Sequence, residues 1–585
     1  YQILKLHPAG TTENILNLSG VETATLKALQ KKGLVDCTLE PHDFSPAPVQ
    51  LAQMPLTLNE DQKKATQHVL NAQHQYQAFL LDGLTGSGKT EVYLHIMHEV
   101  LKQGKQVLVL VPEIGLTPQT ISRFKSRFNC DIALLHSGLN DSKRLQAWQQ
   151  AQTGKASIIL GTRSAIYTPL PRLGLIILDE EHDLSYKQQE GFRYHARDVA
   201  LYRGHLQGCP VLLGSATPSI DSYHLVETGK LTALQLNQRA GHALLPKMHL
   251  IDLKIVKKQH GISQPLIEQI KNTLARKEQV LIFLNRRGYA PVLVCESCGW
   301  QANCPHCDAH FTLHTQPYSY LHCHHCGTVH RLPDHCPECQ QKSLKTLGAG
   351  TAKVEEHLQE LFPDHDVIRV DRDSTSRVGS WQKIYDRIQQ NKPSILLGTQ
   401  MLAKGHHFPH VTLVAILDID AGLLSVDIRA PERTAQLIVQ VAGRAGRGEH
   451  KGHVYLQTLR PDHPLLTTLI EKDYRAVAKQ TLAERKVALL PPYRYVVLIR
   501  AESKDRDYTL HFLNEAAEQL RQIAGDIVDI WGPIPAPMER KAGRYRAHMV
   551  ILSADRARLH FYLRQWWAQL VHVPRSEERR VGKEC

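Results

Sequence analysis

A glycine-rich segment that follows an apolar run constrains the fold of this chain more than any other feature. Residues 83–90 read Gly-Leu-Thr-Gly-Ser-Gly-Lys-Thr and match the pattern GxxxxGK[ST] in full, after the apolar residues 78–81 and before a helical stretch at 91–101. Glycines in this pattern let backbone N–H groups close around phosphates, and the N-terminus of the following helix adds its dipole. A chance match is the alternative, but the order of strand, loop and helix favours a phosphate site.

Apolar runs with the length of buried strands alternate with helical stretches along most of the chain. A first set covers residues 77–81, 106–111, 156–160, 175–178 and 211–213, and a second covers 279–284, 366–370, 394–397, 411–417 and 452–457. Alternation of this kind is typical of βαβ units, in which helices cover a parallel sheet. We therefore expect an α/β fold with two consecutive lobes.

Composition and charge exclude several classes of protein. The chain has 585 residues, 42% of them hydrophobic, and a net charge of +13. At about 150 residues per domain, this length predicts a basic globular protein of several domains. No uninterrupted apolar run approaches the ~18 residues of a membrane span, so we expect no membrane role. Because the chain starts at Tyr1 without a signal-peptide pattern, we expect it to begin inside a longer protein.

Two acidic residues, Asp179 and Glu180, follow the apolar run at 175–178. An acid at a strand end is placed to hold Mg²⁺, and its neighbour to polarise the water that attacks a γ-phosphate. In the glycine-rich segment, Lys89 would neutralise phosphate charge and Thr90 would ligate the metal. Either acid alone would more often be a solvated loop residue. Together with the phosphate pattern, the pair predicts ATP bound with Mg²⁺.

Eight of the 12 cysteines lie between Cys295 and Cys339 as four CxxC pairs. A CxxC turn places both sulfurs on one side, so eight thiolates supply two tetrahedral sites of the closed type that suits structural Zn²⁺. The spacing alone permits several pairings, and an iron–sulfur cluster is the alternative. Cysteines arranged in this way indicate metal binding in a reducing compartment.

Several segments taken together resemble the superfamily 2 helicases of the DExH type. They are residues 83–90, 179–182, 214–217, 398–405 and 440–447. Four more segments and the CxxC pairs make the chain similar to the PriA family of bacterial primosomal helicases. These segments are residues 111–117, 136–139, 161–165 and 185–198.

The resemblance implies two RecA-like parallel-sheet lobes, with a zinc-binding insertion in the second lobe and a small α+β C-terminal domain. Residues 1–54 would be the remnant of an N-terminal DNA-binding region and a linker. The implied boundaries after it are 55–237 for the ATP-binding first lobe, 238–470 for the second lobe with its insertion at 293–342, 471–574 for the C-terminal DNA- and partner-binding domain, and 575–585 for an atypical tail.

The function implied by the resemblance is that of a cytoplasmic ATP-dependent 3′-to-5′ DNA helicase. Such a helicase recognises stalled or forked replication structures, unwinds the lagging-strand arm and initiates primosome assembly. The implied partners are forked and single-stranded DNA, single-stranded DNA-binding protein, and primosome and helicase-loading proteins. A fork-binding scaffold with a secondary ATPase activity is the alternative. The cysteine insertion disfavours an RNA helicase or a chromatin-type translocase.

Site residues are implied by the same motifs. The ATP-binding group is Gln62, Gly83, Gly86, Gly88, Lys89 and Thr90. The catalytic group is Lys89, Asp179, Glu180, Gln440, Arg444 and Arg447. Gln62 would read the adenine, and Ser215 and Thr217 would couple hydrolysis to unwinding. Arg444 and Arg447 would act as arginine fingers, which means that they would bring positive charge to the γ-phosphate from the second lobe. A guanidinium suits this role because it pairs with phosphate oxygens in two places.

The segment after the acidic pair mixes aromatic and basic residues. Its candidates for sensing DNA are Tyr186, Lys187, Phe192, Arg193 and Tyr194. Rings stack on bases and cations pair with phosphates, so we expect this loop to signal DNA binding to Glu180. The alternative is that the three aromatic residues only pack the loop down.

For the cysteines, the resemblance implies a nested arrangement of two structural Zn²⁺ sites. One site is Cys295, Cys298, Cys336 and Cys339, and the other is Cys304, Cys307, Cys323 and Cys326. In the C-terminal part, the residues expected to bind phosphates are Arg540, Lys541, Arg544 and Arg546. Trp566 and Trp567 are expected in the core.

Three features depart from the family pattern. The N-terminal DNA-end-binding region is mostly absent. Ala352 stands where the family commonly has Glu, which would weaken a DNA contact in the second lobe. Residues 575–585 read like translated sequencing-adapter DNA.

Overall fold

The structure, a computed structural model, forms two compact units, residues 1–47 and 48–585. It describes residues 23–35, 50–113, 118–239, 246–284, 292–295, 297–298, 300–306, 310–314, 319–323, 328–347, 351–371, 374, 380–399, 402, 408–417, 419–423, 427–446, 451–571 and 582–584. In the first unit, the described part contains helix α3 (Thr23–Lys31). The sheets and the candidate sites belong to the second unit.

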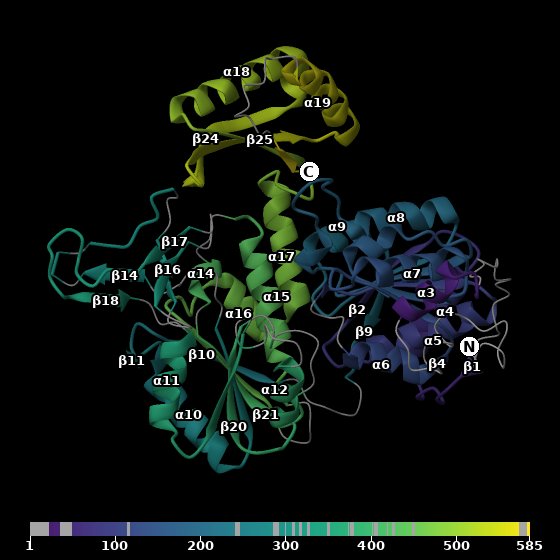
Figure 1. Ribbon diagram of the computed structural model, residues 1–585, viewed down its shortest axis with the longest axis horizontal. Helices are drawn as coiled ribbons and strands as arrows, with labels where there is room; N and C mark the ends of the chain where they lie inside the picture. The colour runs from purple at the N-terminus through teal and green to yellow at the C-terminus, as the bar shows by residue number, and fades with distance from the viewer. Residues whose placement is uncertain are drawn as a thin grey trace. The chain divides into compact units, whose positions relative to one another are not determined.

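A seven-stranded parallel sheet forms the first lobe of this unit (Figure 1). Its strands are β2 (Ala78–Gly83), β3 (Gln106–Leu110), β5 (Ile132–Leu135), β6 (Ile158–Gly161), β7 (Leu173–Asp179), β8 (Val211–Ser215) and β9 (Thr232–Leu236). The order across the sheet is β5-β6-β3-β7-β8-β2-β9. In the same lobe, β1 (Gln50–Leu51) pairs antiparallel with β4 (Phe128–Asn129).

Helices cover both faces of the first sheet, which is why its central strands are buried along their length. One apolar core contains residues of α4 (Glu60–Leu70), α5 (Lys89–Lys102) and α6 (Pro118–Arg127). The core on the other face contains residues of α7 (Asp141–Gln152), η2 (Arg163–Tyr167), η3 (Leu184–Tyr186) and α8 (Ala196–Gln207). Helix α9 (Ile220–Glu227) follows β8.

The second lobe is built around a six-stranded parallel sheet of order β10-β22-β21-β13-β20-β19. These strands are β10 (Lys247–Asp252), β13 (Gln279–Phe283), β19 (Asp366–Val370), β20 (Ser394–Gly398), β21 (Val411–Ile416) and β22 (His453–Thr458). One face packs on α10 (Gln264–Ala275) and α11 (Thr351–Leu361). The other packs on α12 (Ser380–Ile388), α14 (Asp420–Leu423), α15 (Ala430–Ala442), α16 (Pro464–Glu471) and α17 (Tyr474–Val487). A small hairpin pairs β11 (Lys258–Gln259) with β12 (Ile262–Ser263).

The cysteine-rich insertion folds as an antiparallel sheet of order β17-β16-β15-β14-β18. Its strands are β14 (Val292–Cys295), β15 (Thr312–His314), β16 (Tyr320–His322), β17 (Val329–Arg331) and β18 (Leu344–Leu347). The chain enters it after β13 and leaves it before α11 of the second lobe.

The C-terminal domain is a small α+β layer pair. Its sheet, of order β24-β25-β23-β26, consists of β23 (Tyr495–Ser503), β24 (Asp529–Lys541), β25 (Arg544–Ser553) and β26 (Gly582–Glu584). Helices α18 (Arg506–Ala524) and α19 (Arg556–Val571) lie on one face of this sheet (Figure 1), and η5 (Gly525–Ile527) follows α18. Trp566 is fully buried and donates from Nε1 to the carbonyl oxygen of Ala516, 2.8 Å away. Trp567 packs beside it.

The predicted fold class is confirmed, but the sequence analysis missed three strands of the two described parallel sheets. They are β5, β9 and β10, and each lies at an edge of its parallel sheet. Only some residues of each are buried. These three strands therefore lack the continuous apolar run by which the buried central strands were found.

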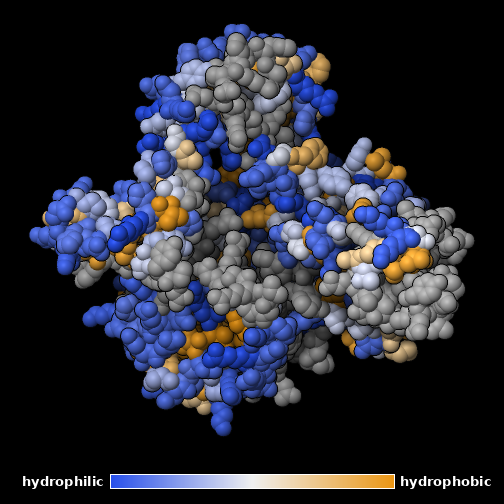
Figure 2. All heavy atoms as spheres, in the orientation of Figure 1, coloured by the Kyte–Doolittle hydropathy of each residue, from blue (hydrophilic) through white to orange (hydrophobic). Residues whose placement is uncertain are grey.

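On the face of the molecule seen in Figure 2, hydrophilic side chains dominate and apolar ones form separate patches. Among the described helices, none combines the length and the apolar character needed to cross a membrane.

We expect Trp566→Ala to destabilise the C-terminal domain by about 3–5 kcal/mol, because it leaves a cavity between α18 and α19. Hydrogen exchange of the β23 and β25 amides would measure the loss. Trp567→Ala is the matched control, and its cost should be smaller because Trp567 is only partly buried. Equal losses in the two variants would contradict this assignment of the core.

Candidate functional site

The phosphate-binding pattern forms the loop between β2 and α5. Gly86 and Gly88 have φ values of +83° and +80°, which disfavour any residue with a side chain. Lys89 begins α5, and its Nζ donates a hydrogen bond to the carbonyl oxygen of Gly83 at 2.8 Å. The buried hydroxyl oxygen of Ser87 has no hydrogen-bond partner among the described residues. A loop whose conformation requires glycines, and which carries a lysine and a buried hydroxyl without a hydrogen bond, fits the phosphates of a nucleotide.

Gln62 lies against this loop from the first turn of α4. Its Oε1 accepts from the backbone N–H of Asn59, and its Nε2 donates to the carbonyl oxygen of Ser87, both at 2.9 Å. A Cβ at Gly88 would collide with Nε2 of Gln62. Gln62 therefore braces the loop in this structure, and its reading of adenine stays a prediction. Thr90 stands in the first turn of α5.

Asp179 ends β7 and is held from α5. The Tyr93 hydroxyl donates to Asp179 Oδ1 at 3.0 Å, and a Cβ at Gly214 would overlap that hydroxyl, so only glycine fits at this place in β8. Burial, and then the neighbouring Glu180 carboxylate, raise the pKa of Asp179 to about 6. The sequence analysis missed Tyr93. Its position one helical turn after Lys89 was the signal that placed it near the phosphate loop.

Glu180 has a φ of +49°, in the left-handed region that residues with a side chain rarely adopt. Its Oε2 has no hydrogen-bond partner among the described residues, and His182 Nδ1 lies 3.7 Å away. A carboxylate oxygen left without a hydrogen bond fits the role of orienting an attacking water.

His182 connects the acidic segment to residues 214–217 and to the second lobe. Its Nδ1 lies 2.7 Å from the Ser215 hydroxyl oxygen, which also accepts from the backbone N–H of Thr217 at 2.9 Å. On the other side of the ring, His182 Nε2 contacts Nε2 of Gln440 in α15. Ser215 and Thr217 are fully buried, and their role in coupling hydrolysis to unwinding stays a prediction.

The end of α15 faces the phosphate loop. A Cβ at Gly443 would lie 2.7 Å from Cγ2 of Thr85, which leaves room only for glycine. Arg444 follows and is largely buried. Arg447 lies outside the described residues. The finger roles of the two arginines stay predictions.

The aromatic residues after the acidic segment do not behave alike. Tyr186 is fully buried, so the expectation that its ring faces DNA is wrong, and the packing alternative holds for this residue. Phe192 is 77% exposed, with its ring centroid 5.9 Å from that of Tyr194. Lys187 and Arg193 are half-buried. The side chain available for a base at the tip of this loop is therefore Phe192.

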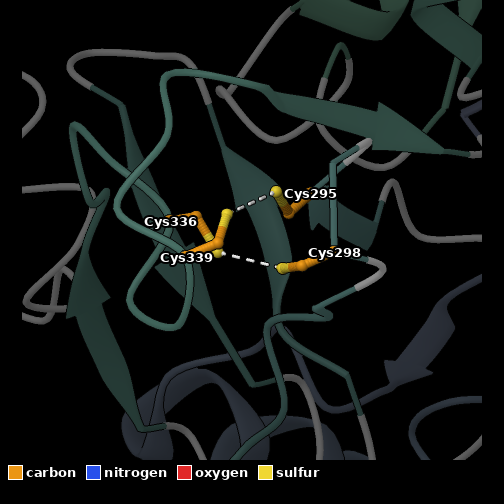
Figure 3. Close-up of side chains that lie close together, drawn as sticks. All are labelled: Cys295, Cys298, Cys336 and Cys339. Atoms are coloured by element: carbon orange, nitrogen blue, oxygen red, sulfur yellow. Dashed lines mark hydrogen bonds between the residues drawn. The ribbon is translucent and has the colours of Figure 1, made fainter.

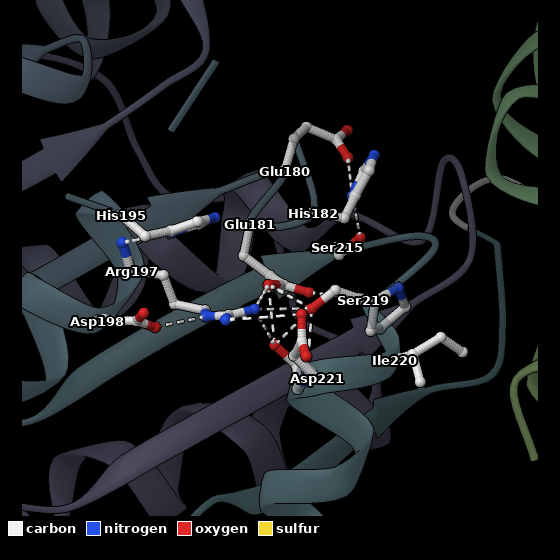
Figure 4. A network of polar contacts seen from close by, with 12 residues as sticks. Glu180, Glu181, His182, His195, Arg197, Asp198, Ser215, Ser219, Ile220 and Asp221 are labelled. Carbon is white, nitrogen blue, oxygen red and sulfur yellow. Dashed lines mark hydrogen bonds and ion pairs between the residues drawn. The ribbon is translucent and has the colours of Figure 1, made fainter. Parts of the chain in front are cut away.

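A buried ionic network, which the sequence analysis missed, surrounds Glu181 (Figure 4). The Glu181 carboxylate accepts from the backbone N–H of Ser219 at 2.7 Å and from the Ser222 hydroxyl at 2.8 Å. Arg197 Nη1 lies 3.5 Å from Glu181 Oε2 and donates to the Ser219 hydroxyl at 2.9 Å. A third consecutive acid after a buried strand was the signal for this network.

Four cysteines of the insertion form a candidate metal centre (Figure 3). The Sγ atoms of Cys295, Cys298, Cys336 and Cys339 all lie within 4.8 Å of one another. The Ser343 hydroxyl, 3.1 Å from the Cys295 sulfur, lowers the pKa of that thiol to about 6. Four thiols at this spacing are a donor set for tetrahedral Zn²⁺.

The second predicted cysteine set lies partly outside the described residues. Cys304 and Cys323 are buried in one apolar cluster of the insertion. Cys307 and Cys326 are not described, so this set stays a prediction.

The cations expected to bind phosphates lie on the β24–β25 hairpin. Arg540 and Lys541 end β24, Arg544 and Arg546 lie in β25, and the Arg540 guanidinium is 5.7 Å from the centroid of the Tyr545 ring. Ala352 lies in α11.

Three known families match consecutive parts of the chain. The family described as DEAD/DEAH box helicase matches residues 59–226, and the helicase conserved C-terminal domain matches residues 343–449. The primosomal protein N C-terminal domain matches residues 486–582. Among solved structures, RecG bound to a three-way DNA junction is similar at 18% identity and a TM-score of 0.44, over 73% of this chain and 47% of that one.

Two curated relatives carry the name replication restart protein PriA. The protein from Haemophilus influenzae is 49% identical over 553 residues, which are 93% of this chain and 75% of the relative. The protein from Bacillus subtilis is 38% identical over 565 residues, 95% of this chain and 70% of the relative. With the helicase and primosomal families matched along its length, the chain belongs to the PriA family of replication restart proteins.

Proposed function

We propose that this chain is an ATP-dependent 3′-to-5′ DNA helicase that acts at stalled or forked replication structures, unwinds the lagging-strand arm and initiates primosome assembly. The observation that carries the proposal is the contact between His182 of the first lobe and Gln440 of the second, beside the phosphate loop. A hydrolysis site that includes residues of both lobes ties the chemistry to their relative motion. The PriA relatives support the choice of DNA and of replication restart.

The site divides the work of hydrolysis among its residues. Thr90 and Asp179 are the residues that would hold a Mg²⁺ ion bound with ATP, and the ion would supply positive charge against the phosphates. Lys89 exchanges the Gly83 carbonyl for the phosphates. Glu180 orients the attacking water.

The second lobe completes the site. Arg444 and Arg447 stabilise the charge of the transferring phosphoryl group, a contribution of about 10³ or more in rate. Their binding to the nucleotide closes the cleft between the lobes, and hydrolysis reopens it. Single-stranded DNA held through its phosphates is then moved without regard to sequence.

Further partners follow from the C-terminal domain and the family. The cations of the β24–β25 hairpin bind DNA phosphates, while single-stranded DNA-binding protein and the primosome and helicase-loading proteins dock on the same domain and on the insertion. The chain works in the cytoplasm, where thiols stay reduced.

A scaffold that binds forks and recruits the primosome, with ATP turnover secondary, is the second candidate. Lys89→Ala separates the two functions. We expect this variant to lose ATP hydrolysis and strand displacement on forked DNA, because nothing else on the loop neutralises the phosphates. Lys102→Ala, at the exposed end of the same helix, should match the parent chain. Persistent unwinding by Lys89→Ala would refute the helicase, and persistent helicase loading without unwinding would favour the scaffold.

The exposed tip of the aromatic segment gives a separate prediction. Phe192→Ala combined with Tyr194→Ala should keep basal ATP hydrolysis but lose its stimulation by single-stranded DNA, since base stacking contributes about 1–3 kcal/mol per base. Tyr202→Ala, which removes an exposed ring from α8, is the control. Normal stimulation in the double variant would reject a DNA-sensing role for these rings.

The insertion is proposed to hold two structural Zn²⁺ ions in the nested arrangement. Its described residues form one small apolar cluster, so it depends on metal for folding, at about 10–16 kcal/mol for each structural zinc. Its role is contact with the separated strand and docking of partners.

Metal analysis of the purified protein tests this arrangement. We expect two zinc ions per chain and no visible absorbance, and one zinc ion after Cys336→Ser, because the other set keeps its four thiolates. Cys209→Ser, which changes a buried cysteine of the first lobe, should retain both ions. Iron in place of zinc would support the iron–sulfur alternative.

A further inference from the structure

We propose that Arg475 is a positioning residue by which the second lobe holds the base of the phosphate loop, so that closure of the two lobes raises the affinity for ATP. The base of the phosphate loop is defined here as Asp82, near the end of β2, and Asn237, which follows β9. The inference rests on the proposed function, in which the lobes close around the nucleotide, and adds to it the contact through which closure reaches the loop.

Arg475 is carried by the second lobe. It lies in the first turn of α17, whose Tyr474, Val477 and Leu482 belong to the apolar core on one face of the second sheet. Because these side chains fix the helix to the second lobe, α17 moves with that lobe. Arg475 itself is half-buried, and its guanidinium reaches β2 of the first lobe.

The guanidinium donates hydrogen bonds to three atoms of the first lobe. Nε donates to Asp82 Oδ2 at 2.7 Å, Nη2 to the Asp82 carbonyl oxygen at 3.3 Å, and Nη1 to Asn237 Oδ1 at 2.8 Å. An exposed ion pair contributes little, but the Asp82 carboxylate is buried, and a guanidinium fork loses little freedom when it bonds several acceptors at once. We therefore expect this contact to bias the equilibrium between open and closed lobes.

Asp82 transmits the contact directly to the phosphate loop. Its carbonyl group belongs to the peptide bond with Gly83, the first residue of the loop, whose own carbonyl oxygen accepts from Lys89 Nζ at 2.8 Å. The Tyr223 hydroxyl of α9 also donates to Asp82 Oδ2, at 3.0 Å. The carboxylate is thus bonded from both lobes, and the strand end that carries the loop is restrained while Arg475 is in place.

Asn237 connects the contact to a second strand beside the loop. It follows Leu236, whose carbonyl oxygen accepts from the backbone N–H of Leu84 at 3.3 Å. The backbone N–H of Asn237 donates to Asp61 Oδ2 at 3.1 Å, and Asp61 precedes Gln62 in the first turn of α4. The guanidinium therefore restrains the phosphate loop through two neighbouring strands, β2 and β9.

The residue before Arg475 makes a separate contact between the lobes. The Tyr474 hydroxyl donates to the carbonyl oxygen of Pro218 at 2.7 Å and accepts from Gln436 Nε2 of α15 at 3.2 Å. This contact is independent of the guanidinium, so we expect it to persist when Arg475 is changed. Variants of Arg475 should therefore loosen the closed arrangement of the lobes without abolishing it.

Loss of the Arg475 contact lowers the fraction of molecules whose lobes are closed before ATP binds. The apparent affinity for a ligand falls with the fraction of the protein in the binding-competent state, whereas saturating ligand restores that state. We therefore expect a higher KM for ATP and a kcat close to the parent value.

The test uses Arg475→Gln and Arg475→Lys in the full chain. ATP hydrolysis is measured in the presence of single-stranded DNA, and the affinity for a fluorescent, non-hydrolysable ATP analogue is measured by anisotropy. We expect the KM for ATP and the Kd of the analogue to rise about tenfold for Arg475→Gln and about threefold for Arg475→Lys, because an ammonium keeps the charge but not the fork of donors. Lys479→Gln, at an exposed position one turn later in α17, is the matched control and should keep the parent values.

A purely structural role would lower kcat and thermal stability and leave the KM for ATP unchanged, and that outcome overturns the inference. If Arg475→Gln fails to fold because the Asp82 charge is left unpaired, Arg475→Gln combined with Asp82→Asn removes both charges. This pair should also raise KM about tenfold, since both changes break one contact, and the parent KM in the pair overturns the inference as well. A parent chain that hydrolyses no ATP refutes the proposed function and this inference together. A parent chain that hydrolyses ATP, with variants at the parent KM, refutes the inference alone.

Discussion

The parallel pairing of β7, β8 and β2 is the constraint on which the site depends. These strands are neighbours in the first sheet, with Asp179 opposite Gly214 and Asp82 opposite Ser215. Because parallel strands end at the same edge, the acidic segment, residues 214–217 and the phosphate loop meet there before any side chain interacts. Backbone hydrogen bonding between the strands therefore sets the position of this edge. Gly214 and Tyr93 then determine the finer position of the Asp179 side chain at the edge.

The burial of each strand determines whether it could be predicted from the sequence. Central strands are buried on both faces and show as apolar runs, so both lobes were found, while the edge strands β5, β9 and β10 were not. Motif residues such as Lys89 and Asp179 were recognisable because phosphate and metal chemistry restricts the residue types. The partner in a contact between distant residues cannot be read from local spacing: the spacing places Tyr93 near the phosphate loop but does not indicate its hydrogen bond to Asp179. Tyr186 shows the converse error, since an aromatic residue in a basic loop gives no sign of being fully buried.

Buried polar groups in the first lobe do more for geometry than for stability. Placing the Glu181 carboxylate out of water is costly, and hydrogen bonds from Ser219 and Ser222 with the Arg197 charge offset that cost without a large surplus. Such a network permits few arrangements of its members. Tyr93 is restricted in a similar way, because its hydroxyl occupies the space that the missing side chain of Gly214 leaves open.

The first and last strands of the cysteine insertion pair with each other. Val292 of β14 lies opposite Leu347 of β18, and the pairing continues to Cys295 opposite Leu344. Among the described residues, the insertion's strands therefore form a sheet of their own, to which the host sheet contributes no strand. A change within the insertion's sheet therefore breaks no backbone hydrogen bond between strands of the host sheet.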